Sequence, residues 1–297
     1  MKNINWSELG FGYFKTDYNV RCEYKDGKWG ELYATEDVNM NIHMASTCLH
    51  YGQEVFEGLK AFRGADGKVR LFRVEENAKR MINSGEYLKM AVPSVELFTK
   101  ACIEAVKLNA DYIPPYGSGA SLYLRPMLIG VGPQVGVKPS ADYLFAVFVT
   151  PVGPYYKDGF NCIKVIIDYD HDRAAPKGTG HVKVGGNYAA SLDSGEIAHQ
   201  KGFASVIFLD PATKQYIDEC SAANFFGIRD GKYITPDSHS VLPSITNKSL
   251  RQIAEDLGLK VEQRKVGVEE LPTFSEAGCC GTAAVISPIG SVYDPRT

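Results

Sequence analysis

Residues 151–161 (PVGPYYKDGFN) constrain the fold of this 297-residue chain more than any other stretch. They cluster proline, glycine and tyrosine between two β-rich segments, and proline and glycine favour loops over regular structure. The sequence therefore predicts two domains, an N-terminal α/β domain over 1–152 and a C-terminal domain over 163–297. An interdomain loop over 153–162 would join them.

Hydrophobic periodicity predicts mixed secondary structure on both sides of this loop. Phe98, Cys102 and Ala105 recur at helical spacing, and Ser94 just before them offers an N-cap. The expected helices are 75–90, 94–109, 188–202 and 247–258. A turn followed by a strand is expected over 64–72. The other expected strands are 121–130, 142–151, 162–170, 204–210 and 281–289, with short strands near 215–235. This order lacks the regular alternation of a doubly wound sheet, which favours a mixed α/β (α+β) class.

The composition of the chain argues against several classes of binding partner. A net charge of −3 provides no basic field that would attract nucleic acid or an anionic membrane surface. No run of about 18 apolar residues occurs that could span a bilayer. The seven cysteines are an odd number without C-x-x-C spacing, which predicts a reducing cytoplasm, and the six histidines show no metal-binding spacing, so no metal is expected. The expected partners are a small molecule and a second copy of the chain.

The stretch 178–190 (GTGHVKVGGNYAA) contains one formally charged side chain, Lys183. A P-loop needs Gly-Lys-Ser/Thr, whereas Val182 and Val184 flank this lysine, and a dinucleotide fingerprint from Gly178 would need glycine in its place. An apolar, strand-like setting would disfavour the charged amine and favour a nucleophile that forms a Schiff base. The alternative is a solvated lysine on a β-edge, which is the more frequent situation.

A Schiff-base cofactor such as pyridoxal phosphate also needs an acidic partner for its ring nitrogen and donors for its phosphate. Glu219 ends a short expected strand and is followed by small residues and Asn224. Ile245 and Thr246 lead into a helix whose free N–H groups and positive dipole end suit a phosphate. The alternatives are a solvated turn carboxylate and an ordinary helix cap.

Six segments together resemble the branched-chain amino acid aminotransferases, which are fold-type IV pyridoxal-phosphate enzymes. They occur in the family's order and spacing and extend over nearly the whole chain. The segments are LHYGQEVFEGLKAFRG (49–64), VRLFRVEENAKRM (69–81), GSGASLYLRPMLIG (117–130), KVGGNYAAS (183–191), DECSAANFF (218–226) and GTAAVISPI (281–289). The resemblance implies a two-domain, D-aminotransferase-like fold whose C-terminal domain binds pyridoxal 5′-phosphate.

The resemblance also implies roles toward this cofactor. Lys183 would form the Schiff base and move the proton between the substrate α-carbon and the cofactor, and Glu219 would pair with the pyridine nitrogen. The other cofactor-binding residues implied are Arg80 for the phosphate, Ile245 and Thr246 for further phosphate contacts, Tyr188 for the phenolic oxygen, Asn224 and Thr282. Without the resemblance, Arg80 would be interpreted as an exposed helix arginine and Tyr188 as a packed tyrosine.

The substrate-binding residues implied by the resemblance are Tyr51, Phe56, Tyr123, Arg125, Val137, Thr282 and Ala283. Arg125 lies two residues beyond Tyr123, on the same strand face, and would bind the distal carboxylate of glutamate or 2-oxoglutarate. Thr282 and Ala283 would present backbone N–H groups to the α-carboxylate. Val137 would reach the neighbouring subunit's pocket in a homodimer.

Two features depart from the family pattern. Lys15 stands where many relatives have an aromatic residue, so Phe14 is expected to serve as that wall of the pocket. The sequence ends in SVYDPRT, just past its last expected strand, whereas relatives continue into a terminal helical segment.

The implied activity is the ping-pong transfer of the amino group of L-leucine, L-isoleucine or L-valine to 2-oxoglutarate, giving the branched 2-oxo acid and L-glutamate. The nearest alternative on the same fold is a D-amino acid aminotransferase or an aminodeoxychorismate lyase, although SLYLRP and LHYGQEVFEGLKAF favour the branched-chain enzymes. The alternative from another class is a non-catalytic phosphate-binding protein with Thr246 at an anion-binding helix.

Overall fold

The computed structural model of the chain describes residues 2–155 and 161–297. The described chain divides into two compact units. The first unit holds the residues up to Tyr155 together with Lys183–Gly185, and the second holds the remaining described residues. The expected interdomain loop over 153–162 includes 156–160, which lie outside the described residues. The limits of the two expected domains therefore stay a prediction.

The first unit is built on an antiparallel sheet in the order β2-β1-β8-β7-β5-β6, with β3 paired to β1 and β4 paired to β7. Its strands are β1 (Asn19–Lys25), β2 (Lys28–Trp29), β3 (Tyr33–Thr35), β4 (Glu54–Phe56), β5 (Leu59–Arg63), β6 (Val69–Leu71), β7 (Ser121–Gly130) and β8 (Tyr143–Val152). Strands β7 and β8 pair along their whole length. Because side chains alternate along a strand, Tyr123 and Arg125 share one face of β7, and Leu122 and Leu124 lie on the other.

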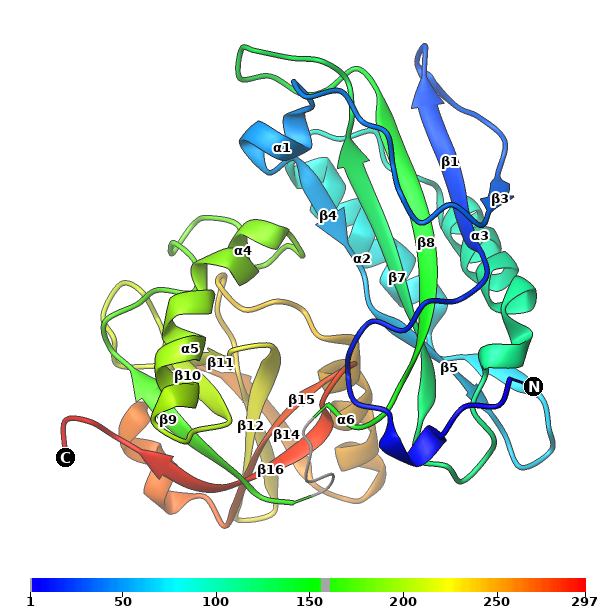
Figure 1. Ribbon diagram of the computed structural model, residues 1–297. Coiled ribbons are helices and arrows are strands. Elements are labelled where there is room, and N and C mark those ends of the chain that lie inside the picture. The colour runs from blue at the N-terminus through cyan, green and yellow to red at the C-terminus, as the bar shows by residue number, and fades with distance from the viewer. Residues whose placement is uncertain (1, 156–160) are drawn as a thin grey trace. The chain divides into compact units, whose positions relative to one another are not determined.

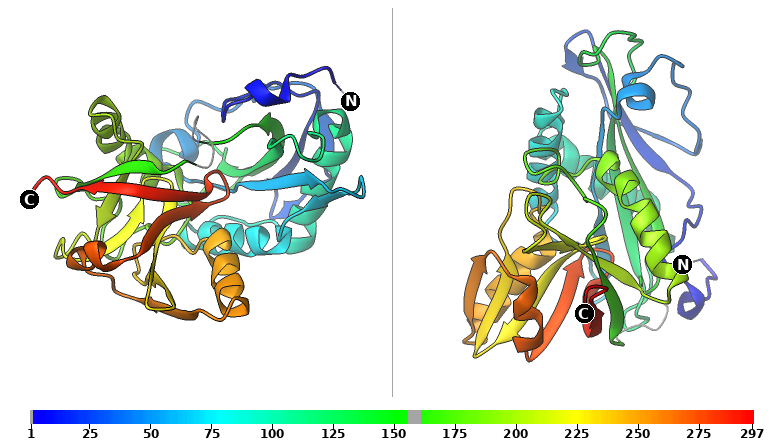
Figure 2. Two further views of the ribbon diagram at one scale, coloured as in Figure 1. Left: turned by 90° about the horizontal axis from the view of Figure 1, so that it is seen from below. Right: turned by 90° about the vertical axis from the view of Figure 1, so that its left-hand side faces the viewer.

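Helices α2 (Val74–Tyr87) and α3 (Val95–Leu108) lie beside each other against this sheet (Figure 1; Figure 2). Ser94 caps α3 as predicted, since its side chain accepts a hydrogen bond from Leu97 N at 3.1 Å. Both helices are confirmed, but α2 ends at Tyr87 instead of residue 90. Lys89 has a left-handed φ of 58°, which ends the helix there. The shorter helices of this unit are η1 (Trp6–Glu8), α1 (Thr47–Tyr51) and η2 (Ala110–Tyr112).

The second unit contains a mixed sheet in the order β11-β10-β9-β16-β15-β12-β13-β14. Because β11 also pairs with β12, the strands from β11 round to β12 close into a barrel. Strand β9 runs parallel to both β10 and β16. The strands are β9 (Ile163–Asp168), β10 (Ser205–Leu209), β11 (Ile217–Cys220), β12 (Ala223–Arg229), β13 (Lys232–Pro236), β14 (Lys260–Arg264), β15 (Glu276–Gly281) and β16 (Val285–Tyr293).

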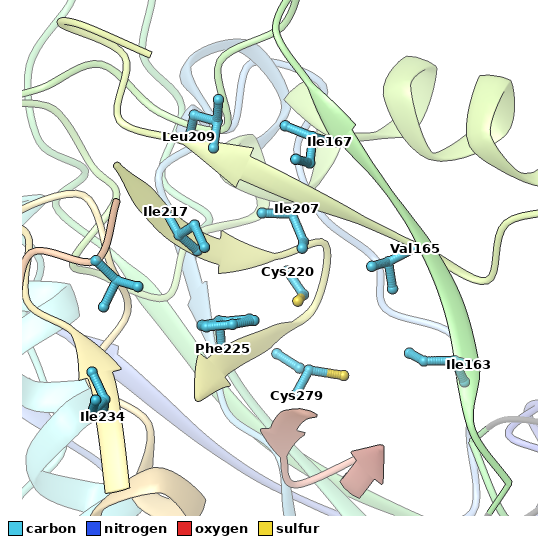
Figure 3. Close-up of a cluster of buried hydrophobic side chains, with 12 residues drawn as sticks. Ile163, Val165, Ile167, Ile207, Leu209, Ile217, Cys220, Phe225, Ile234 and Cys279 are labelled. Atoms are coloured by element: carbon cyan, nitrogen blue, oxygen red, sulfur yellow. The ribbon is translucent and has the colours of Figure 1, made fainter. Parts of the chain in front are cut away.

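Buried apolar side chains from these strands form the core of the second unit (Figure 3). Every second residue of β9 contributes to it, namely Ile163, Val165 and Ile167, and Phe225 of β12 is fully buried among them. Burial of each such side chain stabilises the fold by about 1.5–3 kcal/mol. The alternate residue Ile166 points to the other face, where it packs in a cluster with Ala198 of α5 (Leu192–Gln200). The barrel strands are therefore held from both faces.

The helices of the second unit are α4 (Gly185–Ala190), α5 (Leu192–Gln200), α6 (Ile245–Asp256) and η3 (Val268–Thr273). The helix expected over 188–202 is divided at Ser191, whose Oγ donates to Tyr188 O at 2.9 Å and so competes with the helical hydrogen bonds. The helix expected over 247–258 is confirmed as α6, which begins two residues earlier.

The strand expected over 281–289 is wrong in its first part. Residues 282–284 form the turn of a hairpin between β15 and β16. Val285, which opens β16, has a left-handed φ of 57°, a conformation that β-branched residues rarely adopt.

No helix within the described ranges has the length and apolar character needed to cross a membrane. Within residues 2–155 and 161–297, no three His, Cys, Asp or Glu side chains are grouped so that they could hold a metal ion.

Candidate active site

Lys183 lies in an irregular segment immediately before α4, not in the strand-like setting expected from its flanking valines. Residues of the first unit hold its backbone. Lys183 N donates to Ser84 Oγ at 3.0 Å, and Lys183 O accepts from Phe56 N at 3.2 Å. Gly185 N donates to the Glu54 carboxylate, and a side chain at Gly185 would overlap that carboxylate. The expected strand is wrong, because the Lys183 backbone is bonded to the Ser84 hydroxyl and the Phe56 amide and not to a neighbouring strand in a regular β-ladder.

The environment of Lys183 makes its amine less basic than that of an ordinary lysine. Its Nζ lies 4.6 Å from the centroid of the Phe56 ring. Burial, followed by the positive charge of Arg80, lowers the pKa of Lys183 from 10.5 to about 8, although Glu57 and Tyr123 oppose this change. A lysine with such a pKa is a neutral nucleophile in a large fraction of molecules near pH 8. This environment contradicts the alternative of a solvated β-edge lysine.

Arg80, on α2, has a side chain that is only 10% exposed, and it forms a two-bond ion pair with Glu57. Arg80 Nε donates to Glu57 Oε1 and Arg80 Nη2 donates to Glu57 Oε2, both at 2.8 Å. Glu57 is fully buried and also accepts from Asn77 Nδ2 at 2.8 Å and Gly58 N at 3.2 Å. Breaking a buried pair of this kind by removing one partner costs about 3–5 kcal/mol. The alternative of an exposed helix arginine is therefore contradicted.

Tyr123 and Arg125 lie on one face of β7, as the sequence predicts. Arg125 donates to the Tyr123 hydroxyl from Nε at 3.4 Å and from Nη2 at 3.2 Å. Its guanidinium carbon lies 4.8 Å from the centroid of the Phe56 ring, so this ring is next to both Arg125 and Lys183. A side chain at Gly58 would overlap the Tyr123 hydroxyl, which explains the glycine at this position.

The aromatic residue that packs beside Tyr123 is Phe11, with a distance of 5.1 Å between the two ring centroids. Phe14 was the sequence candidate for the pocket wall near Lys15, and this role stays a prediction. Phe14 N donates to Thr150 Oγ1 at 2.8 Å, and its ring centroid lies 6.2 Å from that of Tyr112.

Tyr51 and Val137 lie in peripheral parts of the first unit. Tyr51 is the last residue of α1, and its hydroxyl donates to Val135 O in the loop after β7. Val137, in the same loop, is 86% exposed. The role of Val137 toward a second subunit stays a prediction.

Glu219 lies in β11 of the second unit and is buried, in contrast to the solvated turn carboxylate of the alternative interpretation. Its Oε1 lies 2.7 Å from Arg173 Nε and accepts from Leu242 N at 3.4 Å. Its Oε2 accepts from Asn224 Nδ2 at 2.8 Å. Burial raises the pKa of Glu219, and the charge of Arg173, the Leu242 amide and Asn224 act in the opposite direction.

The first turn of α6 has the form expected of an anion-binding helix start. Ser244 is the N-cap, and its side chain accepts from Asn247 N at 3.1 Å. Ile245 is buried and Thr246 is partly exposed. The first N–H groups of a helix have no partner within the helix, so they suit an anion.

The remaining sequence candidates of the second unit lie in α4 and in the β15–β16 hairpin. Tyr188 is in α4, and its carbonyl oxygen accepts from Ser191 N at 3.1 Å. Thr282 and Ala283 are partly buried in the hairpin turn. Backbone conformations such as that of Val285 often occur where a loop has a binding role. The roles assigned to these residues stay predictions.

Sequence reasoning missed several side chains that support these groups. They are Phe11, Glu57, Lys60, Ser84, Arg173 and Asn247. Lys60 lies opposite Tyr123 on β5, and burial lowers its pKa to about 8. The charges of Glu57 and Lys60 within the mainly apolar segment EVFEGLKAF could have marked these two residues as candidates for the site. No local pattern marks Ser84 or Arg173.

Comparison with known proteins gives a consistent result. A model of the amino-transferase class IV family matches residues 54–292. The chain is 52% identical to the branched-chain-amino-acid aminotransferase of Haemophilus influenzae over 299 residues, which cover 98% of this chain and 87% of that protein.

Solved structures agree with this result. The chain resembles the branched-chain amino acid aminotransferase of Escherichia coli with a TM-score of 0.78 and 29% identity, covering 94% of this chain and 87% of that one. It resembles the T.th. branched-chain amino acid aminotransferase, complexed with N-(5′-phosphopyridoxyl)-L-glutamate, with a TM-score of 0.76 and 27% identity over the same shares. The fold class expected from the sequence is confirmed.

Proposed function

The chain belongs to the class IV aminotransferases and, within them, to the branched-chain-amino-acid aminotransferases, and we propose that it uses pyridoxal 5′-phosphate to transfer the amino group of L-leucine, L-isoleucine or L-valine to 2-oxoglutarate. The products would be the branched 2-oxo acid and L-glutamate, formed in a ping-pong order. The observation that carries the proposal is Lys183, an amine of lowered pKa whose backbone is held on both sides.

The charges around Lys183 fit an anionic cofactor. Arg80 and Arg125 both lower the pKa of Lys183, so two positive groups act on the amine within the first unit. Glu57 binds Nε and Nη2 of Arg80, and arginine is a side chain that commonly binds phosphate groups. When bound, pyridoxal 5′-phosphate supplies an aldehyde that exchanges with amino groups and a ring that stabilises negative charge at the substrate α-carbon.

Lys183 would hold the cofactor covalently and, after the substrate amine replaces it, carry a proton to and from the substrate α-carbon. A pKa of about 8 suits both tasks, because the amine can be a nucleophile and a base near neutral pH. Phe56, 4.6 Å from Nζ, excludes water from one side of the amine.

Glu219 would bind the protonated ring nitrogen. Its neighbours Arg173, Leu242 N and Asn224 Nδ2 all favour the ionised carboxylate that this role requires. Ile245 and Thr246 would bind the phosphate through the first turn of α6. Tyr188 would bind the phenolic oxygen, and Thr282 would add a further contact to the cofactor.

The substrate pocket must accept a branched aliphatic side chain in one half-reaction and a carboxylate in the other. Phe56 and Tyr123 offer apolar ring surface, and Arg125 lies against both rings with a charged fork for the distal carboxylate. Tyr51 would extend this wall, and Thr282 and Ala283 would bind the α-carboxylate through their amides.

The proposal includes a homodimer in the cytoplasm. Val135 and Val137 are 85% and 86% exposed in one loop, and exposed apolar clusters commonly mark protein interfaces. All seven cysteines lie in the described part of the chain and none is joined in a disulfide there, which suits a reducing compartment.

An absorbance titration tests cofactor, chemistry and substrate together. The purified protein should be yellow, L-leucine should bleach the visible band, and 2-oxoglutarate should restore it. D-alanine serves as the control and should leave the band unchanged. Reduction with borohydride, followed by peptide mapping, should find the cofactor attached to Lys183. A colourless protein after incubation with pyridoxal 5′-phosphate, or bleaching by D-alanine alone, contradicts the proposal.

A further inference from the structure

A series of hydrogen bonds between buried side chains extends through the second unit from β13 to Glu219. Tyr233 and Asn247 begin it, because the Tyr233 hydroxyl donates to Asn247 Oδ1 at 2.9 Å. Asn247 Nδ2 donates to Asn224 Oδ1 at 3.1 Å, and Asn224 Nδ2 donates to Glu219 Oε2 at 2.8 Å. All four residues are at most 7% exposed. The first turn of α6, which contains Asn247, is thus connected to the carboxylate.

One backbone carbonyl determines which group donates and which accepts in each hydrogen bond of this series. Phe225 O can only accept, and the Thr235 hydroxyl donates to it at 2.8 Å. The Thr235 oxygen therefore accepts from Asn247 Nδ2, at 2.8 Å. This orients the Asn247 amide so that it also donates to Asn224 Oδ1. Asn224 must then turn its NH₂ group toward Glu219.

A second acceptor requires the same orientation at the other end of the series. Asn224 Nδ2 also donates to Leu242 O at 3.1 Å, which an amide turned the other way could not do. Glu219 consequently meets an N–H donor from Asn224, in addition to Leu242 N and the charge of the Arg173 guanidinium. Two N–H donors and a neighbouring positive charge stabilise an ionised carboxylate and disfavour a protonated one.

We propose that Asn247 is a positioning residue for Glu219, which it keeps oriented and ionised through the amide of Asn224. This inference rests on the proposed function, in which Glu219 binds the cofactor ring nitrogen. Asn247 lies next to Thr246 in the first turn of α6. Asn247 therefore links the helix start that would bind the phosphate with Glu219, which would bind the ring nitrogen.

The test compares the affinities of two cofactors for the apo-protein. Pyridoxal 5′-phosphate and its 1-deaza analogue carry the same phosphate and aldehyde, but only the first has a ring nitrogen. The ratio of their dissociation constants therefore measures the contribution of Glu219. A general loss of structure would weaken both ligands equally and leave this ratio unchanged.

Asn247→Asp has nearly the same shape and replaces the NH₂ donor by an acceptor, so Asn224 loses its partner or turns its oxygen toward Glu219. We expect the preference for pyridoxal 5′-phosphate over the analogue to fall about tenfold. Asn247→Leu, which adds no charge, should change the ratio in the same direction. Ser249→Ala is the matched control, because Ser249 Oγ is buried on the same helix but donates to Ile245 O at 2.8 Å. It should leave the ratio as in the wild type.

Two outcomes separate the inference from the proposed function. If the wild type prefers pyridoxal 5′-phosphate and both Asn247 variants keep this preference, the positioning role is overturned and the proposed function stands. If the wild type binds both cofactors equally, or neither, the proposed role of Glu219 fails and the inference fails with it.

Discussion

Lys183 differs from a solvated lysine mainly because its charged form is disfavoured. Its pKa is lowered to about 8, first by burial and then by Arg80, so the amine is protonated below this pH and neutral above it. The rate at which pyridoxal 5′-phosphate attaches to the apo-protein should therefore rise with pH and level off above about 8. Stopped-flow absorbance from about pH 6 to about pH 10, a range that brackets this pKa, measures this rate.

Lys60 provides the control for this experiment, because burial lowers its pKa to about 8 as well. Lys60→Met should attach the cofactor with an unchanged pH profile, whereas Lys183→Ala should bind it without covalent attachment at any pH. A profile that continues to rise toward pH 10.5, the unperturbed value for lysine, would contradict the assigned environment of Lys183.

Arg125 is the residue that we expect to contribute differently to the binding of glutamate and of leucine. Its guanidinium contacts Tyr123 and lies over Phe56, and in the proposed function its charge would bind a carboxylate but not an aliphatic chain. Arg125→Ala should reduce kcat/KM for glutamate about ten- to hundredfold and that for leucine much less, because only glutamate loses a charge-assisted hydrogen bond. Steady-state kinetics with each amino acid provide the measurement. Arg125→Lys should recover part of the glutamate activity, and equal losses for both substrates would exclude this role.

At the scale of elements, two helices begin with the same capping arrangement. Ser94 accepts from Leu97 N and Ser244 accepts from Asn247 N, each at 3.1 Å. Replacing either serine by alanine should lower the free energy of unfolding by about 1 kcal/mol, measured by urea denaturation. Only Ser244→Ala should also weaken the binding of pyridoxal 5′-phosphate, because only α6 is proposed to bind the phosphate. The same loss of affinity in Ser94→Ala would show that the effect is one of general stability.

The elements predicted from the sequence are those with a strong local signal. The α3 helix has an apolar stripe and a capping serine, and β7 spans 121–130 as expected. Apart from β6, which lies within the expected 64–72, the strands before β7 are mostly short or carry charges within the apolar pattern, as in β5, so periodicity alone did not identify them. The division between α4 and α5 depends on one hydroxyl, that of Ser191, which the sequence pattern does not distinguish from other helical serines.

At the scale of the whole molecule, the proposed homodimer rests on the exposed loop that contains Val135 and Val137. Light scattering after gel filtration should give twice the mass of one chain. Val137→Asp should shift the protein toward the monomer and lower its activity at high dilution, because a charge would be buried in the interface. Leu257→Asp is the control, since Leu257 is 75% exposed at the end of α6 and should leave the mass unchanged. A monomeric wild-type protein would rule out the proposed homodimer.

The sequence by itself determined the family, the class of fold and the residue types that carry the proposed chemistry. Lys183 is recognisable because its charge interrupts an apolar segment, whereas Arg80 and Glu219 are recognisable by their places in segments that have the family's order and spacing. The tertiary structure alone decided what surrounds them. Ser84 fixes the backbone of Lys183 from 99 positions away, and Glu57 holds Arg80 from 23 positions away. Burial and the charges of such distant neighbours set the pKa of each group, and neither quantity is a property of the local sequence.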